Sequence, residues 1–323
     1  MPAIEIKNLK KSYTVGFWRK TVRWGLRDLS LTVDSGEIFG CLGPNGAGKT
    51  TTLKLLMGLI YPTEGEVRIL DMAIDDPRMK AQIGFLPEQP YFYDYLTPIE
   101  LLGYYARLSG VPAGEVPQRL TATLRRVGME ESADTPLRRF SKGMLQRIGI
   151  AQAIIHDPKI VFLDEPMSGL DPVGRREVRE LIEGLRHEGK TVFFSTHILS
   201  DAETLCDRVA VLHKGELRGV RAVSDLLAVS ADKSELIIQT THGQAGHGGE
   251  DLTALRALAS KVHAVGDTVR LVIPSADLER ALDAVREAKA KLVSVNPVRG
   301  NLEEYFLEHV SGPPGATKDE EAQ

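Results

Sequence analysis

The 323-residue sequence lacks the features that mark membrane-spanning and secreted chains. No apolar run reaches the roughly 18–20 residues that a helix needs to cross a bilayer. Residues 1–6 contain no basic segment followed by a long apolar one, so no secretory signal is visible. We therefore expect a chain that stays in the cytoplasm and does not itself span a membrane.

Cysteine and excess charge are equally scarce. Of the two cysteines, Cys41 lies in a strand-like run and Cys206 in a helix-like one, and neither has metal-ligand spacing, which predicts small buried side chains. The formal net charge is -4 and the sequence pI is about 6.1, so no general electrostatic attraction to nucleic acid is expected. With 42% hydrophobic and 26% charged residues, the composition is that of a globular protein with room for one large and one small domain.

The pattern of apolar residues predicts a mostly parallel sheet covered by helices. Short strand-like runs alternate with helical periods, which is typical of α/β proteins. Between about residues 88 and 158 the periodicity is mainly helical, which indicates an inserted helical subdomain. The expected strands are residues 3–9, 29–33, 37–42, 160–163, 191–195 and 208–213, and the expected helices include residues 49–59 and 174–187.

The chain changes character after residue 218. Short strands and helices then predict a small α+β domain over residues 219–310. Within it, residues 242–250 are rich in glycine and histidine and are expected to form a solvent loop, and residues 311–323 are expected to be a disordered tail. The strand-like runs are residues 235–241 and 268–273, and the helix-like runs are residues 252–259 and 277–290.

Residues 43–50 form a complete phosphate-loop pattern between an apolar strand and a helix. Glycines let the backbone curl so that successive N–H groups point at phosphate oxygens, and the helix N-terminus adds the positive end of its dipole. We expect Lys49 to reach the β and γ phosphates, Thr50 to ligate Mg²⁺ and Thr51 to contact the α phosphate. The loop residues expected around the ATP phosphates are Gly43, Pro44, Asn45, Gly46, Ala47, Gly48, Lys49 and Thr50.

An acidic pair, Asp164-Glu165, follows the buried-strand run at residues 160–163. Ligands of open α/β sheets bind at the carboxyl ends of the strands, so both side chains are expected at the site. Asp164 is predicted to hold the Mg²⁺ shell. Glu165 is predicted to polarise a water molecule for attack on the γ phosphate.

Three further segments resemble motifs of the ATP-binding-cassette (ABC) ATPases. Residues 140–147, Phe-Ser-Lys-Gly-Met-Leu-Gln-Arg, stand where that family has its signature sequence, residues 168–171 match its D-loop, and His197 matches its switch histidine. The joint order of these motifs is far more specific than any one of them. The resemblance covers residues 3–217 and implies a P-loop NTPase fold. Residues 1–218 would form a nucleotide-binding domain with a β-subdomain, a RecA-like core and a helical subdomain.

In that family two nucleotide-binding domains enclose two ATP molecules, each phosphate loop facing the signature of the partner. The resemblance therefore implies a dimer and places Ser141, Gly143 and Asp171 among the ATP-binding residues. It also implies that Tyr13 stacks on adenine and that His197 holds the γ phosphate and attacking water in register. A lone histidine near a strand end is usually structural, so this last role rests on the resemblance.

The motifs depart from the commonest family pattern at several positions. Lys142 and Met144 replace the usual glycine and glutamine of the signature. Glu88 stands where the family has a glutamine that approaches Mg²⁺ and water, and Gln89 follows it. From the sequence, either side chain is a candidate for that position near the metal.

These departures, the single cassette and the appended domain together resemble the ATPase subunits of ABC-2 type exporters. The resemblance implies integral membrane permease subunits as partners, with the chain held by them on the cytoplasmic face of the membrane. Motion would pass to them through the helical subdomain and residues 88–96, which include Tyr91, Phe92 and Tyr93. Two alternatives stay open: a soluble cassette ATPase that acts on ribosomes or DNA, and a regulatory subunit that binds nucleotide without hydrolysing it.

Overall fold

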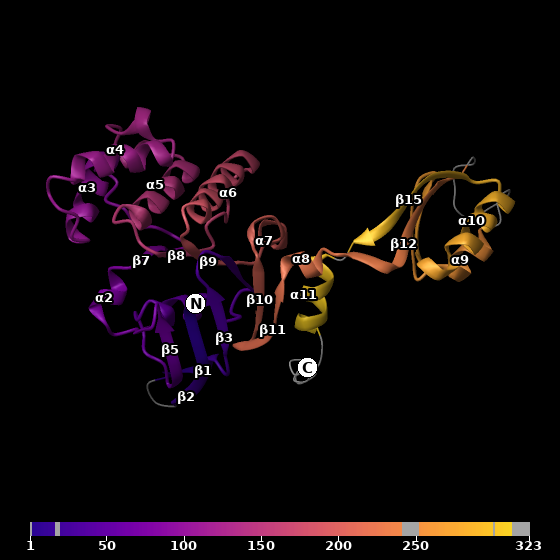
Figure 1. The fold of residues 1–323 in the computed structure, drawn as a ribbon, viewed down its shortest axis with the longest axis horizontal. Coiled ribbons are helices and arrows are strands. Elements are labelled where there is room, and N and C mark those ends of the chain that lie inside the picture. Colours follow the sequence, from indigo (N-terminus) through magenta and orange to yellow (C-terminus); the bar gives the residue numbers. More distant parts are fainter. Residues whose placement is uncertain (1, 17–19, 241–251, 300, 312–323) are drawn as a thin grey trace. The chain divides into compact units, whose positions relative to one another are not determined.

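The computed structural model describes residues 2–16, 20–240, 252–299 and 301–311. They form two compact units, drawn in Figure 1. Unit 1 comprises the chain up to Val223 together with the segment from Tyr305, and unit 2 comprises Ser224–Glu304. The predicted loop at residues 242–250 lies outside the described residues, as does the predicted tail beyond residue 311.

The first sheet of unit 1 is antiparallel and is built around the N-terminal strand. Its strand order is β2-β1-β5-β6, and β3 also pairs with β1. Ile4, Ile6 and Leu9 of β1 are buried in the main hydrophobic core, and alternation along the strand places Ile4 and Ile6 on the same side of the sheet. The strands are β1 (Pro2–Val15), β2 (Thr21–Leu26), β3 (Leu31–Asp34), β5 (Glu64–Ile69) and β6 (Met72–Ala73).

The second sheet of unit 1 has the order β11-β10-β4-β9-β8-β7 and is parallel from β10 to β7. Its central strands are apolar on both sides, and Phe39, Phe162 and Phe193 are fully buried in it. The predicted mostly parallel sheet is thus confirmed. The strands are β4 (Ile38–Leu42), β7 (Ile83–Leu86), β8 (Ile160–Asp164), β9 (Thr191–Thr196), β10 (Arg208–His213) and β11 (Glu216–Ala222).

The helices of unit 1 include a group with a hydrophobic core of its own. Leu102 of α3, Leu124 of α4 and Ile148 of α5 are buried together, in the region where the helical subdomain is predicted. α1 ends three residues before its predicted end, because Gly58 (φ +63°) turns the chain. The helices are α1 (Lys49–Leu56), α2 (Pro77–Lys80), α3 (Pro98–Leu108), α4 (Val116–Arg126), α5 (Lys142–Ile154), α6 (Pro172–His187) and α7 (Leu199–Leu205), with 3₁₀ turns at Glu130–Ser132 and Leu137–Arg139. Two more helices cross the division between the units: α8 (Val223–Leu226) starts at the last residue of the first segment of unit 1, and α11 (Leu302–Ser311) belongs to unit 1 from Tyr305 onward.

The division into units differs from the predicted boundary after residue 218. β11 continues to Ala222 because it pairs with β10 as an antiparallel edge strand of the second sheet. The chain also returns to unit 1 from Tyr305, which the sequence places in the small domain. A Cβ atom on Gly219 of β11 would clash with the Tyr305 hydroxyl, so the absence of a side chain there permits α11 to approach the strand.

Unit 2 is the predicted α+β fold, with the order β12-α9-β13-β14-α10-β15 and an antiparallel sheet in the order β13-β14-β12-β15. This is the ferredoxin-like, split β-α-β arrangement. Its core includes Leu236, Leu255, Leu271 and Val285. The elements are β12 (Val229–Gln239), α9 (Thr253–Leu258), β13 (Lys261–Val265), β14 (Thr268–Pro274), a 3₁₀ turn (Ser275–Asp277), α10 (Leu278–Glu287) and β15 (Lys291–Arg299).

None of the helices in the described ranges combines the length and the apolar character that crossing a membrane requires.

Candidate active site

The phosphate-loop residues lie between β4 and α1. Gly46 and Gly48 have φ angles of +80° and +111°, a backbone region that other residues rarely adopt. A Cβ atom on Gly48 would lie 2.8 Å from the carbonyl oxygen of Gly25, so a second reason for glycine is close backbone approach. The curled loop opens onto the N-terminus of α1, where unpaired N–H groups favour an anion.

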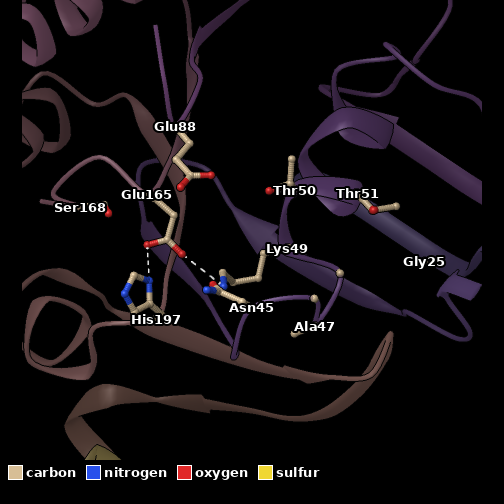
Figure 2. A pocket seen from close by; sticks show the side chains of 12 residues that line it. Gly25, Asn45, Ala47, Lys49, Thr50, Thr51, Glu88, Glu165, Ser168 and His197 are labelled. Atoms are coloured by element: carbon tan, nitrogen blue, oxygen red, sulfur yellow. Dashed lines mark hydrogen bonds and ion pairs between the residues drawn. The ribbon is translucent and has the colours of Figure 1, made fainter.

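A cavity of about 500 Å³ opens beside this loop (Figure 2). Most of its lining comes from the predicted motifs, which the fold brings together from well-separated stretches of the chain. The lining residues are Gly25, Asn45, Gly46, Ala47, Gly48, Lys49, Thr50, Thr51, Glu88, Glu165, Ser168 and His197.

Three titratable side chains meet at the cavity in a continuous chain of contacts (Figure 2). Lys49 Nζ donates a 2.7 Å hydrogen bond to the Gly43 carbonyl and lies 3.2 Å from Glu165 Oε1. Glu165 Oε2 is 2.8 Å from His197 Nδ1. Lys49 and Glu165 are buried, whereas the His197 side chain is 45% exposed. The buried ion pair leaves the histidine as the solvent-facing member of the group.

The backbone holds Glu165 in place at the end of β8. Its N–H donates to the carbonyl and hydroxyl oxygens of Ser195, at 3.2 and 3.1 Å, on the neighbouring strand β9. Its φ angle is +49°, which is strained for a residue with a side chain. Such strain is found where surrounding contacts fix a functional side chain, and here it turns the carboxylate toward Lys49.

Asp164 and Thr50 form an oxygen-rich corner of the site. Thr50 Oγ1 is 3.4 Å from Asp164 Oδ1, which also accepts a 2.5 Å hydrogen bond from Ser195 Oγ. Among the described residues no group of three or more His, Cys, Asp or Glu side chains forms a metal cage. One hydroxyl and one carboxylate nevertheless fit Mg²⁺, which usually binds through one or two carboxylates together with water and substrate phosphates.

Glu88 and Gln89 differ in their relation to the site. Both line a smaller cavity of about 260 Å³ together with Thr50 and Asp164. Only Glu88 of the two also lines the main cavity beside the phosphate loop. The sequence leaves both residues as candidates for the position near the metal. In the structure Glu88 is the one that shares the main cavity with Lys49 and Glu165 (Figure 2).

Tyr13 lies beside Gly25, which lines the main cavity, whereas Tyr13 is not among the lining residues. A Cβ atom on Gly25 would be 2.8 Å from the Tyr13 ring and 3.2 Å from the Thr51 methyl group. Tyr13 is 37% exposed, and Lys11 Nζ lies 5.3 Å from the centre of its ring. The motifs do not predict Gly25 as a site residue. The sequence signal that could have identified it is a glycine inside a strand, which often marks a place where another group approaches the backbone closely.

Ser141, Gly143 and Asp171 do not line the phosphate-loop cavity. They line a second cavity of about 350 Å³, between the start of α5 and the start of α6. Ser141 caps α5 by accepting from the Met144 N–H at 3.3 Å, and Asp171 caps α6 by accepting from the Gly174 N–H at 3.0 Å. Both helix starts line this second cavity, and the N-terminal end of a helix favours an anion.

Comparison with known proteins decides the family. The sequence profile described as ABC transporter matches residues 26–168. An uncharacterized ABC transporter ATP-binding protein of Synechocystis sp. is 41% identical over 314 residues, which cover 94% of this chain and 83% of the relative. The chain belongs to the ABC transporter ATP-binding proteins. The bacitracin transport ATP-binding protein BcrA of Enterococcus faecalis is 32% identical over 317 residues, or 96% of each chain.

A solved structure extends the comparison to the fold of the ABC cassette. A dimeric ATP-binding cassette in a post-hydrolysis state, bound to ADP and Pi, is similar with a TM-score of 0.62 and 28% identity. The match covers 68% of this chain and 98% of that one. The predicted P-loop ABC fold is confirmed, and the chain is an ABC cassette ATPase.

Proposed function

We propose that this ABC ATPase hydrolyses Mg²⁺-ATP as a dimer and that the reaction drives export through separate membrane-spanning subunits. The observation that supports the proposal best is the convergence of Lys49, Glu165 and His197 at the cavity beside the phosphate loop. Phosphoryl transfer to water needs three parts: a cation that binds the phosphates, a base that accepts the water proton, and a group that orients this base.

Glu165 is the general base. It accepts a proton from a water molecule whose oxygen attacks the γ phosphorus, while the bond to the β–γ bridging oxygen breaks and ADP leaves. The ionised carboxylate only accepts hydrogen bonds, so His197 donates from Nδ1 and fixes its orientation. Bound β and γ phosphates compete with Glu165 for the Lys49 ammonium, which frees the carboxylate for the water proton.

The Thr50 hydroxyl and the Asp164 carboxylate would hold Mg²⁺, and Glu88, which shares the main cavity with Thr50, would lie nearer to the ion than Gln89. When bound, the ion neutralises the charge that develops on the transferred phosphoryl group. Ser195 orients Asp164 by donating to Oδ1. Tyr13 stacks on the adenine ring beside Gly25, and Thr51 lies toward the α phosphate.

The second cavity supports a dimer. Ser141, Gly143 and Asp171 line a space that holds none of the phosphate-loop residues, so they bind ATP only if a second copy brings its own loop to them. The solved relative is dimeric and matches most of this cassette. ATP therefore joins two copies, and hydrolysis separates them.

The proposed partners are integral membrane permease subunits, which hold the chain on the cytoplasmic face of the membrane. The named relative from Enterococcus faecalis acts in bacitracin transport and aligns with 96% of this chain, which supports an export role. Specificity for the transported compound belongs to the permease.

The test is affinity purification of the tagged chain from detergent-extracted membranes of its own cells. We expect a multi-span membrane protein to co-purify in a fixed ratio to the chain, together with ATPase activity. Ribosomes or nucleic acid in place of a membrane protein would contradict the export function and favour a soluble cassette ATPase. A membrane complex without ATPase activity would favour a regulatory subunit.

A further inference from the structure

Helix α7 carries a buried carboxylate, Asp201, that has no role in the proposed reaction. Asp201 is 0% exposed, and neither of its carboxylate oxygens accepts a hydrogen bond from the described part of the chain. Burial raises the pKa of this carboxyl, and two arginines, Arg175 and Arg179, act in the opposite direction. Burying a carboxylate costs desolvation free energy, so packing alone does not explain an aspartate at this position.

The partner of Asp201 lies on the neighbouring helix α6. Arg179 Nη1 is 3.5 Å from Asp201 Oδ1, which is an ion pair without hydrogen-bond geometry. Arg175, one turn earlier on the same helix, donates from Nε to the Leu170 carbonyl at 3.2 Å. Buried ion pairs often add little net stability compared with uncharged side chains of the same size, and in some proteins they serve instead to fix the relative position of two elements.

The two elements that this pair joins both lead into the site. α7 begins two residues after His197, and its N-cap residue, Ile198, offers no side-chain acceptor. α6 begins directly after Asp171, at the second cavity. The turn after His197 is held locally by the Ile198 N–H, which donates to Thr196 Oγ1 at 3.0 Å, and α7 buries Ala202 and Leu205. The Asp201–Arg179 pair adds a charged contact between α7 and α6.

We propose that Asp201 is a positioning residue that holds the His197 turn against α6, so that His197 stays in hydrogen-bond contact with Glu165. This inference rests on the proposed roles of Glu165 and His197. The same helix, α6, thus contacts the second cavity with its first turn and holds the position of His197 through Asp201. A shift of α6 then moves His197 relative to Glu165.

The test compares Asp201→Asn with wild type in steady-state ATP hydrolysis and thermal unfolding. The amide keeps the size of the side chain but removes its charge. We expect kcat to fall about tenfold with KM for ATP unchanged, because the contact acts on the base and not on nucleotide binding. We expect the unfolding temperature to stay level or rise, because an uncharged group is easier to bury. The matched control is Glu180→Gln, which removes an exposed Arg176–Glu180 pair on α6 and should change neither quantity.

A second pair of variants separates positioning from a general loss of structure. If Asp201 acts through His197, adding Asp201→Asn to His197→Ala lowers kcat no further, and Arg179→Gln reproduces the effect of Asp201→Asn. A wild-type kcat in Asp201→Asn, or a further tenfold loss on top of His197→Ala, overturns the inference. An inactive wild-type protein would instead count against the proposed function itself.

Discussion

Gly169 lines the second cavity, and its backbone conformation favours glycine. Its φ angle is +67°, and a Cβ atom there would clash with Lys142 Nζ. Gly184, in the last turn of α6, is in the opposite situation: its backbone is helical, and outside its own helix no atom lies within 4 Å of the place that a methyl group would take. The two glycines therefore respond to the same substitution with opposite signs.

We predict that Gly169→Ala destabilises the protein by about 1 kcal/mol, because alanine is strained at positive φ and displaces the lysine. Gly184→Ala is predicted to stabilise it by about 0.5–1 kcal/mol, since alanine is the better helix former. Urea unfolding of both variants beside wild type measures the difference. If both variants changed the free energy of unfolding by the same amount and in the same direction, the positive φ of Gly169 would not be the cause of its effect.

The two cysteines make a second prediction for single residues. Cys41 and Cys206 are buried, and burial raises the pKa of the Cys41 thiol to about 12 and the pKa of Cys206 well above its ordinary value. At pH 8 only about one Cys41 thiol in ten thousand is then ionised, and the thiolate is the reactive form. A colorimetric disulfide reagent should label neither thiol in the native protein and both in urea. Rapid labelling of the native protein would show that one of them is accessible.

At the scale of elements, the loop before α3 carries exposed aromatic side chains. Tyr91 is 93% exposed and Tyr93 is 58% exposed, whereas Phe92 between them packs on the helical core around Leu102. From the sequence, all three are predicted to form one exposed coupling surface. Phe92 does not belong to it, because its side chain packs against the core of the helical subdomain. Exposed aromatic clusters are typical of protein contacts.

We predict that replacing Tyr91 and Tyr93 together by alanine uncouples transport while basal ATP hydrolysis stays at the wild-type rate. Both side chains lie outside the cavity lining, so the chemistry does not depend on them. Tyr61→Ala, at a 62% exposed tyrosine elsewhere on unit 1, is the matched control and should leave transport intact. The measurement is substrate export in cells that express each variant with the permease. Full transport in the double variant would remove these tyrosines from the coupling surface.

Strands that are buried on both sides were the easiest elements to predict from the sequence, and exposed strands were the hardest. β10 runs over Arg208–His213 as predicted, because its apolar run is buried on both sides of the sheet. β13 is exposed at every position and β15 at most of those described, so their short alternating runs do not mark a buried face. The same limit applies to the site: motifs identified Lys49 and Glu165, whereas Gly25 enters only because the first sheet folds back onto the phosphate loop.

At the scale of the whole molecule, the chain leaves unit 1 and returns to it. α11 approaches β11 through Tyr305 and His309, whose rings lie 4.1 Å apart next to Gly219. The Tyr305 hydroxyl is buried and has no hydrogen-bond partner among the described residues. This return could not be predicted from the local pattern around Tyr305, because it depends on a missing side chain far earlier in the chain.

We predict that Tyr305→Phe leaves the thermal stability level or slightly higher, since it removes a buried hydroxyl that makes no hydrogen bond within the described part of the chain. Tyr305→Ala is predicted to cost about 1–3 kcal/mol, because it removes the ring that packs on β11. Thermal unfolding of the two variants checks both values. If Tyr305→Phe proved as damaging as Tyr305→Ala, the hydroxyl would have a partner that the described contacts do not include.

The central claim, that Glu165 is the base of a closed ATP dimer, is tested most directly by the hydrolysis rate and oligomeric state of Glu165→Gln with Mg²⁺-ATP. The amide keeps the shape of the side chain but cannot accept the water proton. We predict an inactive protein that accumulates as an ATP-bound dimer, while wild type returns to monomer as ATP is consumed. A variant that hydrolyses ATP near the wild-type rate would contradict the role of Glu165 and leave Glu88 and His197 as the groups that activate water.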